Sequence, residues 1–237
     1  MTKINNAIIM AAGMGTRMRP LTNETPKPLV KVNGIRMIES IIQALHQENI
    51  TDITVVTGYL ADKFEFLSKK YENLKLIHNP YFNQYNNISS LYVARKELRN
   101  TIILDGDQLI YNPDILSSNF EKSGYAGSSI NKWSDEWIMH TNEEGKVISC
   151  DRDGGDNGWR LYSVSKWNAA DSSLLGKFVK KEFENKNYDI YWDDIPMFLY
   201  ADKFNLSVHK ISESDIVEID SIKELANIDS SYKKYVK

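Results

Sequence analysis

The sequence contains few residues of the kinds that form disulfides or bind transition metals. It has one cysteine, Cys150, and four histidines whose spacing fits neither a metal site nor a catalytic triad, His46, His78, His140 and His209. One cysteine excludes an intrachain disulfide and fits a cytoplasmic setting. Cys150 has no evident catalytic partner in the sequence, so we expect structural or surface roles for these five residues.

Long apolar runs and a strong excess of one charge are also absent. The polar residues 1–6 precede an apolar run that is too short for a signal peptide or a membrane span, so no membrane partner is expected. The net charge is −3, from 29 Lys and Arg against 32 Asp and Glu. This balance argues against a general nucleic-acid binder, which is usually basic. With 237 residues and no repeat or low-complexity linker, we expect a single domain, 1–237.

The first half of the chain shows alternating strand and helix patterns. Buried strands are expected at 7–10, 53–56, 74–77 and 101–104. Helices are expected between them, at about 36–48, 60–71 and 89–98, the last with Ser89 or Ser90 as its cap. This alternation predicts an α/β fold with a mostly parallel central sheet and helices on both faces.

The second half changes to short β-prone stretches that are separated by polar turns. These stretches lie at 127–130, 137–140, 146–150 and 160–166. A helix near 170–183, a strand near 216–219 and a helical end at 221–235 are expected after them. The change of pattern near residue 108 predicts two halves that share one sheet.

The most informative stretch is 8–29, where an apolar run ends in a G-M-G loop and cations follow. Glycines let backbone N–H groups approach a ligand and form an anion-binding nest. Arg17 adds a bidentate charged group and Lys27 a mobile point charge. Met18 stands where a dinucleotide-binding loop would have its third glycine, and the Gly-Lys-Ser/Thr ending of a P-loop is missing. We expect a polyphosphate cradle of another type, with a tight turn between solvated cations as the alternative.

The longer pattern A-A-G-M-G-T-R-M-R-P-L-T, followed by P-K-P-L-V, spans roughly residues 7–34. It resembles the opening motif of the sugar-1-phosphate nucleotidylyltransferase superfamily. The resemblance implies a Rossmann-like, glycosyltransferase-A-like nucleotidyltransferase fold with a mixed sheet. It also implies a nucleotide-binding half at about 1–108 and an acceptor-binding half at about 109–237.

The same resemblance assigns roles within the opening loop. Contacts to the base and ribose are implied for Ala11, Ala12 and Gly13, with Met14 beside them. Phosphate contacts are implied for Gly15, Thr16 and Arg17. Lys27 is implied to stabilise charge around the α-phosphorus, so Arg17 and Lys27 are expected to be catalytic.

Two pairs of acids provide candidate ligands for a metal ion. Asp105 and Asp107 follow a predicted strand, and ligands bind beyond the carboxyl ends of strands in open α/β sheets. Glu218 and Asp220 stand at strand spacing, so both would face one side. Mg²⁺ prefers oxygen ligands and is usually held by one or two carboxylates together with substrate phosphates. We expect Mg²⁺ on the catalytic Asp107 and on Asp220, as the resemblance also implies, with Glu218 as a further ligand or orienter.

Each of these acids, taken alone, has the alternative of a solvated surface group. Asp105 is expected on the nucleotide side of the site or as a cap of the following turn.

An amide-rich loop covers 79–91. Its Y-N-N-x-x-S-L piece resembles the corresponding segment of bacterial CTP:phosphocholine cytidylyltransferases. Amides supply both a donor and an acceptor to a cytosine edge, so we assign nucleotide contacts to Tyr85, Asn86, Asn87 and Ser90. The alternative is an asparagine-rich loop that makes its own turns.

Aromatic and acidic residues occur together at 133–137 and 188–194. A quaternary ammonium has no N–H to donate, so aromatic faces often bind it, at roughly 0.5–2 kcal/mol per contact. Packing in the core is the alternative, but acids beside the rings are unfavourable in an apolar core. The pieces D-E-W, Y-W-D and V-S-x-W are similar to pieces of the phosphocholine enzymes, with Asp135 as a mild departure. The candidate acceptor contacts are Glu136, Trp137, Tyr191, Trp192 and Asp193.

These observations predict a Mg²⁺-dependent cytidylyltransferase that converts CTP and phosphocholine to CDP-choline and pyrophosphate. The acceptor phosphate is already ionised near neutral pH, so catalysis needs positioning and charge stabilisation rather than a general base. Another acceptor is the main alternative, namely 2-aminoethylphosphonate, phosphoethanolamine, or a sugar or polyol phosphate. A non-catalytic nucleotide-sensing subunit is a further alternative, which the metal-binding acids oppose. We expect a monomer or a small homo-oligomer.

Overall fold

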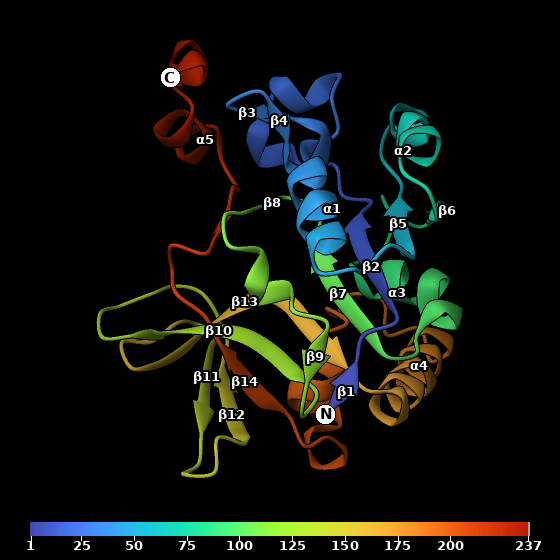
Figure 1. The fold of residues 1–237 in the computed structure, drawn as a ribbon, viewed down its shortest axis with the longest axis vertical. Helices are drawn as coiled ribbons and strands as arrows, with labels where there is room; N and C mark the ends of the chain where they lie inside the picture. Colours follow the sequence, from blue (N-terminus) through green and yellow to red (C-terminus); the bar gives the residue numbers. More distant parts are fainter. Residues whose placement is uncertain (237) are drawn as a thin grey trace.

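A mixed nine-stranded sheet forms the centre of the protein, and the computed structural model describes residues 1–236 (Figure 1). Four parallel neighbours lie in the order β7 (Thr101–Asp105), β2 (Asn6–Ala11), β5 (Ile53–Thr57) and β6 (Leu74–His78). The long strand β13 (Gly158–Trp167) runs antiparallel beside β7 and joins the two halves of the chain. The expected strands of the first half and the single shared sheet are confirmed.

Helices cover both faces of this sheet, as expected. On one face α1 (Met37–Gln47) and α2 (Glu65–Lys70) bury apolar side chains in one core cluster. On the other face α3 (Ile88–Ala94) and α4 (Ala169–Glu184) pack in a second cluster. Apolar residues at i, i+3, i+4 and i+7 produce the buried stripe of α1. No helix among the described residues is long and apolar enough to cross a membrane.

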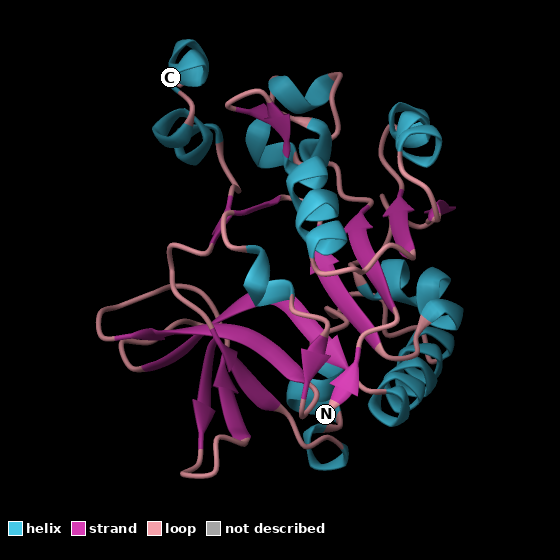
Figure 2. Cartoon of the chain, viewed as in Figure 1, coloured by secondary structure: helices cyan, strands magenta, loops and turns pink. Residues whose placement is uncertain are grey.

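The second half extends the sheet with further strands, which lie at the lower left of Figure 2. They are β10 (Gly124–Ile130), β11 (Ile138–Thr141), β12 (Val147–Asp151) and β14 (Ser207–Lys210). β10 pairs antiparallel with β13 and parallel with β14, and β11 pairs with β12 and β13. Two short ribbons, β1 (Thr2–Lys3) with β9 (Asn119–Phe120) and β3 (Lys31–Val32) with β4 (Ile35–Arg36), lie outside the main sheet.

One further ribbon connects the end of the chain to the central sheet. β15 (Ile216–Glu218) pairs antiparallel with β8 (Gln108–Ile110), which directly follows β7. The helix α5 (Ile222–Ile228) begins after this ribbon with a Ser221–Glu224 capping box. Because β8 follows β7, this pairing brings the late acidic residues to the carboxyl end of the parallel sheet.

Two local expectations are wrong. Asn87, not Ser89 or Ser90, occupies the N-cap position of α3, because both serines lie inside the helix and accept hydrogen bonds from the buried Asn79. The region around Tyr191 and Trp192, for which the sequence predicts no element, forms a turn before a π-helix (Ile195–Leu199). The expected helix at 221–235 is divided into α5 and a 3₁₀ segment, Ser230–Tyr235.

Candidate active site

The site lies where β2 and β7 end side by side. These strands are parallel neighbours, so the glycine loop after Ala11 and the acidic turn after Asp105 emerge at the same edge. The Gly106 N–H donates to the Met10 carbonyl at 2.8 Å, which ties the acidic turn to β2. The parallel register of β2 and β7 thus brings the two motifs together.

The glycine loop encloses a cavity of about 270 Å³. The described residues that line it include Gly13, Gly15, Thr16, Arg17, Lys27, Asp107 and Asp220. Glycine-rich backbone, two cations and two carboxylates in one lining match the groups expected around a phosphate chain beside a metal. Ala11 lines the same cavity, whereas Ala12 is buried beside it at 5% exposure.

Gly15 is required by both backbone and packing. Its φ is +58°, in the left-handed region that favours glycine. A Cβ at this position would lie 2.9 Å from the Lys27 Cβ. The Thr22 hydroxyl donates to the Gly15 carbonyl at 2.8 Å and fixes this conformation. The loop and Lys27 are therefore packed directly against each other.

Lys27 lies between two carboxylates. Its Nζ is 2.6 Å from Oδ2 of Asp107 and 2.7 Å from Oδ1 of Asp220. Arg17 reaches the same Asp220 oxygen from the solvent side at 2.8 Å. The structure thus brings together both expected catalytic cations and two of the three expected metal ligands.

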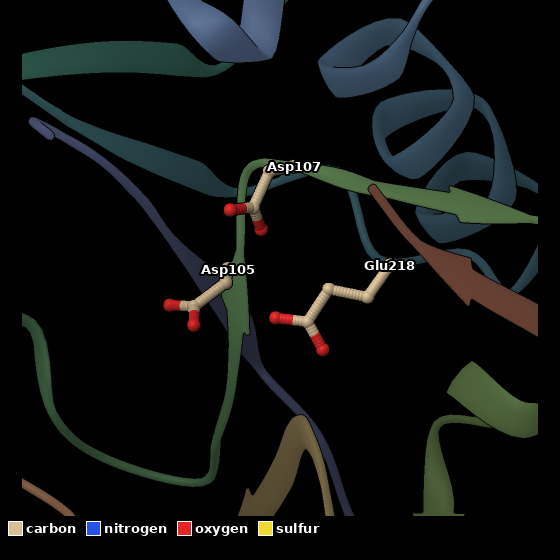
Figure 3. A group of neighbouring side chains, drawn as sticks. All are labelled: Asp105, Asp107 and Glu218. Carbon is tan, nitrogen blue, oxygen red and sulfur yellow. The ribbon is translucent and has the colours of Figure 1, made fainter. Parts of the chain in front are cut away.

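Three carboxylates form a cluster beside Lys27, from Asp105, Asp107 and Glu218, with oxygens within 4.8 Å of one another (Figure 3). Burial, and then the charge of Asp107, raises the pKa of Asp105 to about 7. The same two causes raise the pKa of Glu218 well above its usual range. Like charges at this separation are unfavourable unless protons or a cation bind among them.

The donor set of this cluster fits Mg²⁺. All three groups offer oxygen, the ligand type that Mg²⁺ prefers. The Oδ1 atom of Asp107 is buried and has no hydrogen-bond partner among the described residues, so it is available to a metal. Asp105, which the sequence placed with the nucleotide or the turn, belongs to this cluster. Asp220 lies at its rim, bonded to Arg17 and Lys27.

A second cavity, of about 420 Å³, adjoins the first at Arg17, Asp107 and Asp220. Seven carboxylates line it: Asp105, Asp107, Asp135, Glu136, Asp193, Glu218 and Asp220. Of the described side chains in its lining, one is a cation, Arg17. A concave site with this charge attracts cations.

Two aromatic side chains form a wall of this acidic cavity. Trp137 and Tyr191 lie with ring centroids 5.9 Å apart and planes at 85°. Tyr191 is 47% exposed, so its ring is accessible. Trp192 is 4% exposed and packs against Tyr125 and Trp167. Trp192 is therefore a core residue, and its assignment to the acceptor is corrected.

The remaining acceptor candidates are acids of this second cavity. Burial, and then the charge of Asp105, raises the pKa of Asp193 well above its usual range. Burial also raises the pKa of Glu136, while Arg160 opposes the shift from 3.4 Å. A bound cation would favour the ionised form of both groups.

The amide-rich loop is held mainly by its own structural bonds. Asn86 donates from Nδ2 to the Asp189 carbonyl at 3.0 Å and accepts from the Asn87 N–H at 2.7 Å. The Asn87 Oδ1 accepts from the Trp192 N–H at 2.9 Å, and its side chain lines the acidic cavity. Tyr85 stacks on Tyr188 at 3.9 Å.

Ser90 lies within α3, and its hydroxyl accepts a hydrogen bond from the Asn79 side chain. These contacts agree with the alternative of a loop that makes its own turns, and nucleotide contacts from the four residues stay a prediction.

Arg152, which the sequence did not indicate, supports the aromatic wall together with Asp194. The Arg152 guanidinium lies over the Trp137 ring and pairs with the buried Asp194 at 2.5 Å. Arg152 follows a short strand and Asp194 follows the Tyr191 turn, so no spacing signal relates them. Leu161 and Ser163 line the acidic cavity without a sequence signal.

Comparisons with known proteins agree with this geometry. The model of the nucleotidyl transferase family matches residues 6–132. A 2-aminoethylphosphonate cytidylyltransferase from Lancefieldella rimae is 36% identical over 96% of this chain and 93% of that protein. A choline-phosphate cytidylyltransferase from Haemophilus influenzae is 34% identical over 94% of this chain and 95% of that protein. The solved structure of a CTP:phosphocholine cytidylyltransferase from Streptococcus pneumoniae has a TM-score of 0.89 at 31% identity, covering 98% of this chain and 100% of that one.

Proposed function

The chain belongs to the nucleotidyl transferase family and is a cytidylyltransferase for a phosphorylated acceptor, and from this premise we propose that the acceptor is phosphocholine. In the proposed reaction CTP and phosphocholine give CDP-choline and pyrophosphate with Mg²⁺ as the cofactor. The Rossmann-like nucleotidyltransferase fold of the family is the one described above. As part of the proposal the enzyme works in the cytoplasm, where CTP is available, as a monomer or a small homo-oligomer.

The observation that carries the choice of acceptor is the Trp137–Tyr191 wall inside a cavity lined by seven carboxylates. A trimethylammonium group has no N–H to donate, so it is stabilised mainly by aromatic faces and by nearby carboxylates that need no hydrogen bond from it. Each cation–π contact contributes roughly 0.5–2 kcal/mol. Asp193 and Glu136 add Coulomb attraction without needing a hydrogen bond from the ligand.

The junction of the two cavities defines where the phosphates would meet. Arg17, Asp107 and Asp220 line both cavities. We assign the triphosphate to the glycine-loop cavity and the phosphocholine to the acidic one. An oxygen of the acceptor phosphate then attacks the α-phosphorus, and the bond to the leaving pyrophosphate breaks with its electron pair staying on pyrophosphate.

The residues of the chain supply positioning and charge in this step. The backbone of Gly13–Gly15 and the Arg17 guanidinium hold the phosphate chain. Lys27 offsets negative charge that develops around the α-phosphorus. Asp105, Asp107 and Glu218 would hold Mg²⁺, with Asp220 at the rim, and the ion would supply charge neutralisation and alignment of the phosphates. The acceptor phosphate is already ionised, so no side chain needs to remove a proton.

A second candidate acceptor is 2-aminoethylphosphonate, and a specific observation favours it. The relative from Lancefieldella rimae is named a 2-aminoethylphosphonate cytidylyltransferase, and it aligns over nearly all of this chain. A primary ammonium donates three hydrogen bonds, and the carboxylates of Asp135, Glu136 and Asp193 offer acceptors.

A matrix of four nucleoside triphosphates against an acceptor panel tests the proposal by pyrophosphate release. The panel contains phosphocholine, phosphoethanolamine, 2-aminoethylphosphonate, a sugar 1-phosphate and dimethylbutyl phosphate, the carbon isostere of phosphocholine with an uncharged head group. We expect the highest kcat/KM for CTP with phosphocholine. A higher kcat/KM for any other acceptor would reject phosphocholine, and an absence of pyrophosphate with every acceptor would favour a nucleotide-sensing role.

A further inference from the structure

The two aromatic rings of the acceptor cavity come from distant segments. Trp137 precedes β11, and Tyr191 lies in the turn before the π-helix. Their mutual geometry therefore depends on contacts that cross between these segments. One ion pair makes such a connection, between the partly exposed Arg152, directly after β12, and the buried Asp194 at the start of the π-helix.

Asp194 fixes the Tyr191 side of the connection. Its side chain is 2% exposed, and its Oδ2 accepts a hydrogen bond from the Tyr191 N–H at 2.9 Å. Its other oxygen, Oδ1, is 2.5 Å from Nη2 of Arg152. One carboxylate thus holds both the turn that presents the Tyr191 ring and the guanidinium.

Arg152 fixes the Trp137 side. Its Cζ lies 4.2 Å from the centroid of the Phe198 ring and 5.3 Å from that of the Trp137 ring. Phe198 itself packs edge to face with Trp137, with centroids 5.4 Å apart. A planar guanidinium stacks on aromatic rings in a way that a lysine ammonium does not.

We propose that the Arg152–Asp194 ion pair is a positioning device that sets Trp137 relative to Tyr191 and so determines selectivity for a cationic acceptor. This inference rests on the proposed function. Two effects follow from the geometry. The pair holds the indole at a fixed angle to the Tyr191 ring, and Asp194 neutralises a guanidinium that would otherwise repel a cationic acceptor beside Trp137.

The neutralisation predicts different results for two substitutions. In Asp194→Asn the guanidinium of Arg152 keeps its charge without a counter-ion, and the Asn side chain still offers an oxygen to the Tyr191 N–H. In Arg152→Met the cation is removed and Trp137 loses one of its packing partners. Both variants should bind a cationic acceptor less well. The loss for a cationic acceptor, relative to one with an uncharged head group, should be largest in Asp194→Asn.

The test measures kcat/KM for phosphocholine and for dimethylbutyl phosphate, whose head group is uncharged, with CTP saturating, in the full-length enzyme. We expect the ratio of the two values to fall about tenfold in Asp194→Asn, through added repulsion of the cation and loss of cation–π geometry. Arg152→Met should lower the same ratio by a smaller factor. KM for CTP should stay unchanged, which also shows that the variants are folded.

Two further variants make the result specific. Lys210→Met removes a cation that lies over Trp159, 5.1 Å from the ring centroid and outside the acceptor cavity, so the ratio should not change. Arg152→Lys keeps the charge opposite Asp194 but loses the planar face, and it should give an intermediate ratio. If Arg152→Met or Asp194→Asn misfolds and loses CTP affinity, Arg152→Lys tests the positioning role instead.

Two outcomes separate this inference from the proposed function. If the wild-type enzyme prefers 2-aminoethylphosphonate, phosphocholine is rejected as the acceptor. The same variants are then compared on 2-aminoethylphosphonate and on propylphosphonate, its isostere with an uncharged methyl group in place of the ammonium. The positioning role is overturned if Arg152→Lys keeps the wild-type ratio and if Asp194→Asn or Arg152→Met keeps it as well. This conclusion holds whichever acceptor is the substrate.

Discussion

Lys27 and Asp107, which are 80 positions apart in sequence, form a charged hydrogen bond of 2.6 Å inside the protein. Burial by itself would lower the pKa of Lys27, but the charges and hydrogen bonds of Asp107 and Asp220 outweigh it and raise that pKa. The ammonium is therefore charged at neutral pH. It is held at the junction of the two cavities by carboxylates that belong to the proposed metal and substrate site.

Lys27→Ala should lower turnover by about 10²- to 10³-fold, the range found when a preorganised charge or donor is removed from an active site. The reason is that no other side chain takes its place between Asp107 and Asp220 in the described structure. Pyrophosphate release gives the turnover, and circular dichroism checks the fold. Lys31→Ala, at an exposed lysine outside the site, is the matched control and should retain wild-type turnover. Near-normal turnover of Lys27→Ala would contradict the assigned role.

Gly15→Ala should lose both stability and activity. The positive φ of +58° costs an alanine about 1–2 kcal/mol, and the new Cβ would meet the Lys27 Cβ at 2.9 Å. Gly145→Ala is the control, because Gly145 also has a positive φ, +76°, but no described atom lies within 4 Å of a Cβ there. Urea unfolding should show a loss in both variants, whereas pyrophosphate release should fall only in Gly15→Ala. Equal activity in the two variants would show that contact with Lys27 is unimportant.

Lys166 should be a source of pH-dependent instability outside the active site. It is 5% exposed, and burial lowers its pKa to about 8 from 10.5. The unfolded chain therefore binds more protons between these two pH values, so stability rises as pH increases from 8 to 10.5. Below pH 8 the penalty is complete, at most about 3 kcal/mol.

Lys166→Met should accordingly raise the free energy of unfolding at pH 7, by about 1–3 kcal/mol, and this advantage should shrink at pH 10. Urea unfolding of the variant and the wild type at both pH values measures the difference. Lys177→Met, at an exposed position of α4, should change neither value. A Lys166→Met variant that is less stable than wild type at pH 7 would show that the ammonium has a compensating partner.

Trp137→Leu should raise KM for phosphocholine about 5- to 30-fold, because it removes one aromatic face from the acceptor cavity. KM for CTP should stay within a factor of two, since the glycine loop lies in the other cavity. Trp133→Leu is the control, because Trp133 is 67% exposed in the same region. Equal effects of the two substitutions on KM for phosphocholine would reject the aromatic wall as the head-group site.

The features that were predictable from the sequence are those with a local signal. The strand at 7–10 and its G-M-G loop follow from apolar patterning and from glycine chemistry, and β2 has the expected place. The cluster of Asp105 and Glu218 depends on the β15–β8 pairing, which has no local signal. Only the resemblance related those two segments before the structure did.

The features that the sequence did not give have a shared physical origin. The turn at Tyr191 and Trp192 is held by side chains, because Asp194 accepts from the Tyr191 N–H and the distant Asn87 accepts from the Trp192 N–H. Ser89 resembles a cap, yet the buried amide of Asn79 binds it inside the helix. The Asn87–Trp192 contact and the Arg152–Asp194 ion pair, which spans 42 positions, join distant segments and have no local signal in the sequence.

A competition experiment tests the choice of acceptor most directly. The enzyme is given CTP, Mg²⁺ and equimolar phosphocholine and 2-aminoethylphosphonate, and phosphorus NMR follows both products in one tube. Their initial ratio equals the ratio of the two kcat/KM values. The Trp137–Tyr191 wall predicts that CDP-choline forms in excess. An excess of the cytidylyl phosphonate would contradict phosphocholine as the acceptor.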